Sequence, residues 1–429
     1  MPKSDLIPMT VVCLVPPNAI RYISQGGKYK VVVEDEKEWE EERIEDAPSP
    51  LEFPSGVISG FAGEFARIYS KILEPRPPTF FMSALTCLGS LLSGKVRLNS
   101  ALRVDPRLYV LLLGMSGSAK KSTAIDKSVE FFSDTVKEFK FCEGVGSAEG
   151  LYEEMNSVKW DRRLLLCYDE FQQFVNKCKI ESSILLQMVN TLFEKNRYQN
   201  RVKRNAPKLE DAHLAVLSAS TEDTYEKCWE QQFTAIGFNN RLFIVPCDSE
   251  REQSIPPPMA DEDMVYLQEM LRGIIETVGS GVVVGITDKA YKMYDEWYRG
   301  LPTGKHSIRI DTYALRLALL LTINDNRKEI GVRTIKKVIK LCDWQLKVRQ
   351  RYDPLNTDNA YAMVEAKIRR VLLVEPNIPR REIYRQVHAE RCGVRLFESA
   401  LQNLRESGEI GRDGEGNYYL ILDINEVVK

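Results

Sequence analysis

The sequence predicts an α/β protein with a parallel sheet, a phosphate-binding loop and a separate C-terminal helical domain. Segment 108–132 is typical of a buried strand, a glycine-containing loop and a helix that opens on Lys121-Ser122-Thr123. A later apolar strand ends in Asp169-Glu170. Three predicted helices and two short β-runs follow residue 359. Strands that alternate with helices indicate a parallel sheet covered by helices.

The loop before Lys121 has the order that phosphate binding requires. Backbone N–H groups of such a loop surround a phosphate, and the helix N-terminus adds the positive end of its dipole. The loop is one residue longer than G-x-x-x-x-G-K-[ST], because only Lys121, and not Lys120, is directly followed by a hydroxyl residue. We therefore assign the β/γ-phosphates of ATP to Lys121 and Mg²⁺ to Ser122, with Lys120 as the alternative lysine. The predicted nucleotide-binding residues are Gly114, Met115, Ser116, Gly117, Ser118, Ala119, Lys120, Lys121, Ser122 and Thr123. An ordinary strand–turn–helix with surface lysines is the alternative.

Asp169 and Glu170 follow the loop by about fifty residues, at the end of an apolar strand. The first carboxylate is expected to hold Mg²⁺ through water, and the second to orient or deprotonate the attacking water. Strands also end in acidic residues simply where they meet solvent. The preceding phosphate-binding loop favours the catalytic interpretation.

Other polar residues stand at the ends of buried runs. Segment 213–220 predicts a third strand, where Ser218, Ser220 or Thr221 could sense the γ-phosphate or could merely form a turn. Arg241 precedes the apolar run LFIV, a position that in ring ATPases serves as an arginine finger toward a neighbouring subunit. An intrachain salt bridge is the alternative. Arg316 is expected to reach back to the nucleotide, unless it simply ends a buried helix.

A basic segment, 195–208, carries six Lys and Arg residues and no acid. We interpret it as a protruding hairpin that grips a nucleic-acid backbone, with a solvated surface ribbon as the alternative. The C-terminal domain adds local positive charge, although docking of another protein is a second interpretation for it. The predicted DNA contacts are Arg197, Arg201, Lys203, Arg204, Arg381 and Arg395.

Composition limits the classes of function. The net charge is −2, so nucleic-acid contact must come from local patches. Nine cysteines without a C-x-x-C pair and three scattered histidines give no zinc spacing, and several cysteines lie in apolar runs. The most apolar helix candidate, 80–92, is shorter than the ~20 residues of a membrane span. We expect a cytoplasmic protein with reduced thiols and no membrane partner.

Changes in pattern divide the chain into five segments. They are an N-terminal extension with an acidic linker (1–50), the ATPase core with a helical cap (51–258), a helical lid (259–352), a linker (353–358) and a winged helix-turn-helix domain (359–429). Two short β-runs, 10–15 and 29–33, are expected in the extension.

Residues 52–352 resemble the helicase-like ATPase domain of phage, plasmid and genomic-island replication proteins. The resemblance lies in Phe53-Pro before two helices, GMSGSAKKST, GVGSAEGL at 144–151, CYDEF and GFNNRLFIV. The order of these motifs also resembles minichromosome maintenance helicases, which belong to the AAA+ P-loop NTPases and carry a C-terminal winged helix. The chain departs from that pattern in having no glycine directly before the lysine, and serine instead of asparagine at the sensor position.

This resemblance implies a replicative DNA helicase of a mobile element or phage, acting on single-stranded and forked DNA. It implies ATP and Mg²⁺ as cofactors, a hexameric ring with ATP at the subunit junctions, and Lys203 and Arg204 on a hairpin facing the pore. No primase domain is expected within residues 1–50, so a separate primase, initiator or loader could assist. The alternatives are a non-unwinding ATPase switch, such as a helicase loader or a DNA-bound regulator, and a DNA-binding scaffold with a degenerate loop.

Overall fold

The computed structural model describes residues 20–25, 28–33, 51–115, 119–158, 160–199, 208–229, 233, 236–249, 254–353 and 360–421. The chain divides into two compact units, residues 1–47 and residues 48–429. In the first unit, β1 (Ile20–Gln25) pairs with β2 (Lys28–Val33) in antiparallel register. The β-run expected at 29–33 lies in β2, and the one expected at 10–15 falls outside the described residues.

The second unit contains a five-stranded parallel sheet with the strand order β10-β4-β9-β6-β5. Strand β9 lies between β4 and β6, and all six residues of β4 are buried. A continuous apolar run is typical of a parallel strand covered on both faces. The strands are β4 (Tyr109–Gly114), β5 (Phe141–Glu143), β6 (Arg162–Tyr168), β9 (Ala212–Thr221) and β10 (Phe243–Pro246).

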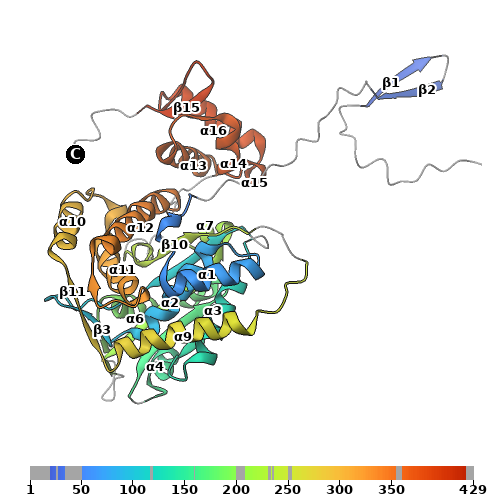
Figure 1. Ribbon diagram of the computed structural model, residues 1–429. Helices are drawn as coiled ribbons and strands as arrows, with labels where there is room; N and C mark the ends of the chain where they lie inside the picture. Colours follow the sequence, from blue (N-terminus) through green and yellow to red (C-terminus); the bar gives the residue numbers. More distant parts are fainter. Residues whose placement is uncertain are drawn as a thin grey trace, which may run out of the picture. The chain divides into compact units, whose positions relative to one another are not determined.

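Helices in the described part of the chain connect or cover these strands (Figure 1). They are α1 (Gly60–Ile72), α2 (Pro77–Leu92), α3 (Lys121–Thr135), α4 (Ala148–Asn156), α5 (Phe171–Cys178), α6 (Leu185–Glu194) and α7 (Glu222–Cys228). Helix α2 has proline at its first position, where the missing N–H costs no hydrogen bond, and from Thr79 onward it is buried throughout. The predicted mixed α/β architecture with a parallel sheet is therefore confirmed.

The segment after the core, expected to be a purely helical lid, also contains strands. Strand β11 (Val282–Ile286) pairs in parallel with β3 (Val96–Leu98) and with β12 (Glu329–Ile330). The helices here are α9 (Asp261–Val278), α10 (Asp288–Arg299), α11 (Ile310–Asn324) and α12 (Val332–Arg351), with α12 packed against α10 and α11 (Figure 1). The small sheet therefore connects this segment to the residues directly before the core.

The C-terminal segment has a hydrophobic core of its own. Helices α13 (Ala360–Val374), α14 (Arg380–Gln386), α15 (Ala389–Cys392) and α16 (Val394–Glu406) precede the antiparallel strands β14 (Ile410–Arg412) and β15 (Asn417–Leu420). A two-residue strand, β13 (Ile378–Pro379), pairs with β15. The predicted succession of helices and a hairpin is present, with α15 and β13 in addition. None of the helices in the described part of the chain is long and apolar enough to cross a membrane.

A buried charge cluster joins the amino-terminal ends of β4 and β9. The Asp105 carboxylate contacts the Arg107 guanidinium and His213 Nδ1, and all three residues are buried. Arg107 also donates to the Leu192 carbonyl of α6, at 2.9 Å. Burial by itself would raise the pKa of Asp105, but Arg107 and His213 hold that pKa well below its ordinary value.

Replacing Asp105 with asparagine should lower the free energy of unfolding by roughly 3–5 kcal/mol, because the buried Arg107 loses its counter-charge. The folded pKa of Asp105 lies below that of an unfolded aspartate, so the carboxylate stabilises the fold above about pH 4 and ceases to do so as the pH falls. Denaturant unfolding at several pH values should show that Asp105→Asn removes part of the acid dependence. Asp211→Asn is the matched control, because Asp211 contacts His213 with a side chain that is 83% exposed, and its loss should cost less than about 1 kcal/mol. Equal losses in the two variants would contradict this account.

Candidate functional site

Lys121 is the first residue of α3, and its side chain folds back over the end of β4. Its ammonium donates to the carbonyls of Gly114, at 3.1 Å, and Met115, at 3.2 Å. Only 8% of Lys121 is exposed. A buried ammonium held by two weakly charged carbonyls lies at the site where a bound phosphate would supply a stronger partner.

The side chain of the neighbouring Lys120 has an acidic partner instead of the loop carbonyls. It lies 3.4 Å from the Glu74 carboxylate, and 44% of its side chain is exposed. Its backbone is left-handed, with φ of 43°, at the position where the resembled families have glycine. Lys121 is therefore the lysine that faces the loop.

Gly114 ends β4 where another backbone passes close by. A Cβ atom at this position would lie 2.2 Å from the Cys247 carbonyl oxygen and 2.9 Å from the Ala119 Cβ. Any side chain here would displace the segment after β10, so close approach requires this glycine. Ser116, Gly117 and Ser118 fall outside the described residues.

Asp169 and Glu170 leave β6 at the same edge of the sheet. In the register, Tyr168 and Leu111 both lie opposite Ser218, and Gly114 lies opposite Thr221. Carboxyl ends of parallel strands therefore meet here, and both carboxylates belong to exposed residues. Burial lowers the pKa of Lys121, while the charges of Glu170, Glu222 and Asp169 oppose that shift. The strand register thus places Lys121 at the same edge of the sheet as the two predicted carboxylates, whose charges raise its pKa.

Glu222 was not predicted as a site residue. It follows β9 just as Glu170 follows β6, and it begins α7. Its carboxylate accepts from the Tyr352 hydroxyl at 2.8 Å and contacts His388 Nε2 at 2.9 Å. An acidic residue directly after the hydroxyl-rich end of a predicted strand was the available signal.

The three hydroxyl candidates on β9 differ in position. Ser218 is level with Leu111, inside the sheet, and its buried hydroxyl has no partner among the described residues. Ser220 lies closer to the edge and donates to the Thr221 carbonyl at 3.1 Å. Thr221 accepts from the Thr224 N–H and thereby caps α7. The hydroxyls of Ser220 and Thr221, which lie nearest the carboxyl edge of the sheet, are thus hydrogen-bonded to neighbouring residues, as expected if they form a turn.

Arg316 does not extend toward the lysine loop. Its guanidinium donates to the carbonyls of Arg107, at 3.1 Å, and Phe193, and lies over the Phe193 ring. Burial lowers its pKa to about 10. These partners precede β4 or end α6, at the opposite edge of the sheet from Lys121, so the structure supports the buried-helix interpretation of Arg316.

Arg241 also lies at the amino edge and is 7% exposed. It donates to the carbonyls of Ile236 and Gly237 and forms an ion pair with Glu194 at 3.3 Å. The intrachain salt bridge that was the alternative to an arginine finger is therefore present. The structure gives Arg241 a partner within its own chain.

The basic segment forms the predicted pair of strands. Strand β7 (Arg197–Gln199) runs antiparallel to β8 (Lys208–Glu210). Arg197 is exposed on this stem, whereas Arg201, Lys203 and Arg204 fall outside the described residues. In the C-terminal segment, Arg381 on α14 and Arg395 on α16 are exposed.

The residues at the loop fit Mg²⁺ in kind. Ser122 is an exposed hydroxyl in the first turn of α3, and Asp169 is an exposed carboxylate at the same edge of the sheet. Oxygen donors of this type, together with substrate phosphates and water, are what Mg²⁺ prefers. Among the residues described, no group of three or more His, Cys, Asp or Glu side chains is placed to hold a metal ion by itself.

Comparison with known proteins adds no relative: no protein-family model matches the chain, and no curated protein matches it significantly.

Lys120 provides a test of the loop geometry. A non-glycine residue in the left-handed region costs about 1–2 kcal/mol. Lys120→Gly removes that cost, loses an exposed ion pair worth up to about 1 kcal/mol and adds a glycine penalty of about 0.5–1 kcal/mol. Its free energy of unfolding should therefore stay within about 1 kcal/mol of the unaltered protein, whereas Lys120→Val should lose more than that. If valine were tolerated as well as glycine in denaturant unfolding, residue 120 would not be left-handed.

Proposed function

We propose that the protein is an ATP-dependent motor that acts on single-stranded DNA, a helicase with a P-loop NTPase core. One observation carries the proposal: Lys121 follows β4 and the Asp169-Glu170 pair follows β6, so both lie at the carboxyl edge of one parallel sheet, with β9 between the two strands. A lysine loop and an acidic strand end in this relation are the two halves of a nucleoside triphosphatase.

Each residue has a distinct chemical task in this proposal. Lys121 would exchange its carbonyl partners for the β/γ-phosphates of ATP and neutralise part of their charge. Ser122 and Asp169 would hold Mg²⁺, which draws off negative charge from the phosphates when bound. Glu170 would accept a proton from the attacking water as the water oxygen bonds to the γ-phosphorus and the bond from that phosphorus to the ADP oxygen breaks.

The sheet order supports the same class. Strand β9 separates the strand of the lysine loop from the strand of the acidic pair, as in the additional-strand ATPases that include the AAA+ helicases. The β7–β8 pair directly precedes β9, where the resembled helicases carry a DNA-contacting hairpin. The helices and hairpin after residue 359 fit a winged helix-turn-helix.

Replacing Glu170 with glutamine tests the catalytic role. The amide keeps the shape of the side chain but cannot accept a proton, so the rate of ATP hydrolysis should fall at least about 100-fold while Mg-ATP still binds. Phosphate release and equilibrium nucleotide binding measure the two quantities. Glu276→Gln, at an exposed position on α9, is the matched control and should hydrolyse ATP normally. Undiminished hydrolysis by Glu170→Gln would refute the assignment.

A second candidate is a non-unwinding ATPase switch, and Glu222 favours it. The charge of Glu222 raises the pKa of Lys121, and the same carboxylate contacts His388 of the C-terminal segment. One carboxylate therefore links the proposed nucleotide loop to that segment. Arg241 also forms an ion pair with Glu194 of its own chain, so this side chain gives no support to a ring whose ATP sites are shared between subunits. Strand displacement on forked DNA separates the candidates. A helicase unwinds the fork when ATP is added, whereas a switch hydrolyses ATP and leaves the fork paired.

A further inference from the structure

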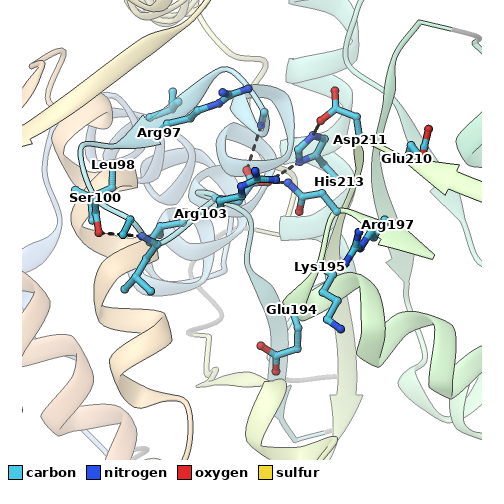
Figure 2. A pocket seen from close by; sticks show the side chains of 17 residues that line it. Arg97, Leu98, Ser100, Arg103, Glu194, Lys195, Arg197, Glu210, Asp211 and His213 are labelled. Carbon is cyan, nitrogen blue, oxygen red and sulfur yellow. Dashed lines mark hydrogen bonds and ion pairs between the residues drawn. The ribbon is translucent and has the colours of Figure 1, made fainter. Parts of the chain in front are cut away.

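A large hollow lies at the amino-terminal edge of the sheet, opposite the lysine loop. Its walls come from β3 and the segment up to Asp105, from the end of α6, from β7 and from the start of β9 (Figure 2). The volume is about 1010 Å³. Small-molecule pockets span roughly 300–1,000 Å³, so this hollow is large enough for a segment of a polymer.

Three of the four acidic residues of the hollow have Arg or Lys partners, and the fourth, Asp211, contacts a histidine. Asp105 contacts Arg107 and His213, and Asp211 contacts His213. Glu194 accepts from Arg309 at 2.7 Å and pairs with Arg241, while Glu210 pairs with Lys208. The negative charge of Asp105, Glu194 and Glu210 is therefore compensated within the protein.

Four basic side chains in the same hollow have no such partner. Arg97, Arg103, Lys195 and Arg197 are exposed, and within the described part of the chain none of them forms an ion pair. In Figure 2, Arg97 and Arg103 lie to the left of His213, and Lys195 and Arg197 lie below and to the right of it. Unpaired cations in a concave site attract an anion with several separated charges.

An exposed tryptophan lies close in the chain to a residue that contacts the wall of the hollow. Arg162 donates to the carbonyl of Glu210, one of the lining residues, at 2.9 Å. Trp160 precedes Arg162 by two residues, so its Cα is at most about 7 Å from that of Arg162. The side chain of Trp160 is 87% exposed. An exposed indole on the segment next to a positively charged hollow is the kind of side chain on which an unpaired base stacks.

We infer that this hollow binds the backbone of a single nucleic-acid strand, with Arg97, Arg103, Lys195 and Arg197 on its phosphates and Trp160 stacked on a base. The inference deepens the proposed function, on which its choice of nucleic acid rests. It adds Arg97, Arg103 and Trp160 to the basic segment that the sequence indicated, which supplies Lys195 and Arg197. Duplex DNA offers no unpaired base to Trp160, so a single strand is the expected ligand.

The test is the affinity of the full chain for a fluorescein-labelled oligo(dT), measured by anisotropy without nucleotide at several salt concentrations. The double variant Arg97→Ala/Arg103→Ala should bind at least about tenfold more weakly, and its slope of log K against log salt should fall by about 1.4, or 0.7 for each lost phosphate contact. Arg272→Ala/Arg333→Ala is the charge-matched control, with both residues exposed on α9 and α12 outside the hollow. It should bind as the unaltered protein does.

Stacking is tested separately. Trp160→Ala should weaken oligo(dT) binding without changing the salt slope, and Trp160→Phe should restore most of the affinity. Equal weakening by the hollow and control variants would overturn the inference, as would tighter binding of duplex than of oligo(dT).

ATP hydrolysis without DNA, measured on the same preparations, keeps this result apart from the proposed function. The Arg97→Ala/Arg103→Ala protein should hydrolyse ATP at the unaltered rate. If the unaltered protein hydrolyses no ATP but Arg97→Ala/Arg103→Ala still loses oligo(dT) binding, the inference about the hollow holds and the proposed motor function is wrong. If ATP hydrolysis is normal and Arg97→Ala/Arg103→Ala binds oligo(dT) unchanged, the inference about the hollow is wrong and the proposed ATPase activity holds.

Discussion

A lysine ammonium buried at the end of a parallel sheet needs negative charge close by, and this requirement organises the structure around Lys121. Burying an unpaired ammonium is costly, and the carbonyls of Gly114 and Met115 compensate it only in part. The ends of β6 and β9 supply carboxylates within electrostatic reach. The sheet order puts these ends side by side, and the absence of a side chain at Gly114 lets the next segment close over the loop.

The two edges of the sheet have different chemistry. At the carboxyl edge, the exposed Asp169 and Glu170 lie at the ends of the same sheet as Lys121, whose ammonium bonds only to backbone carbonyls in the described part of the chain. At the amino edge, Arg107, Arg241 and Arg316 donate to backbone carbonyls or carboxylates that end α6 or flank the strands. These buried guanidinium groups hold helices to the sheet. Arg107 and Arg241 also pair with acidic residues there. The exposed basic side chains of the hollow form no ion pair in the described part of the chain, and they are therefore left available for an external anion.

The sequence allowed the architecture to be predicted where the signal is local. Apolar runs identified the strands, and the hydroxyl residue after Lys121 selected the lysine that faces the loop. Contacts between distant residues gave no such signal. Asp105 and His213 are 108 positions apart, and pairing of β3 with β11 depends on how the intervening core folds. Arginine before an apolar strand, as at Arg241, indicates a need for an anion or acceptors but does not say whether they belong to the same chain.

The central claim is that Lys121, and not its neighbour Lys120, binds the phosphates of ATP. Calorimetric titration of Mg-ATP into Lys121→Ala and Lys120→Ala tests it most directly, since the two variants remove the same group from adjacent positions. A charge-assisted contact is worth about 1.5–3 kcal/mol, so Lys121→Ala should bind Mg-ATP at least about tenfold more weakly, while Lys120→Ala binds as the unaltered protein does. Equal affinities in the two variants, or no binding of Mg-ATP to the unaltered protein, would contradict the account.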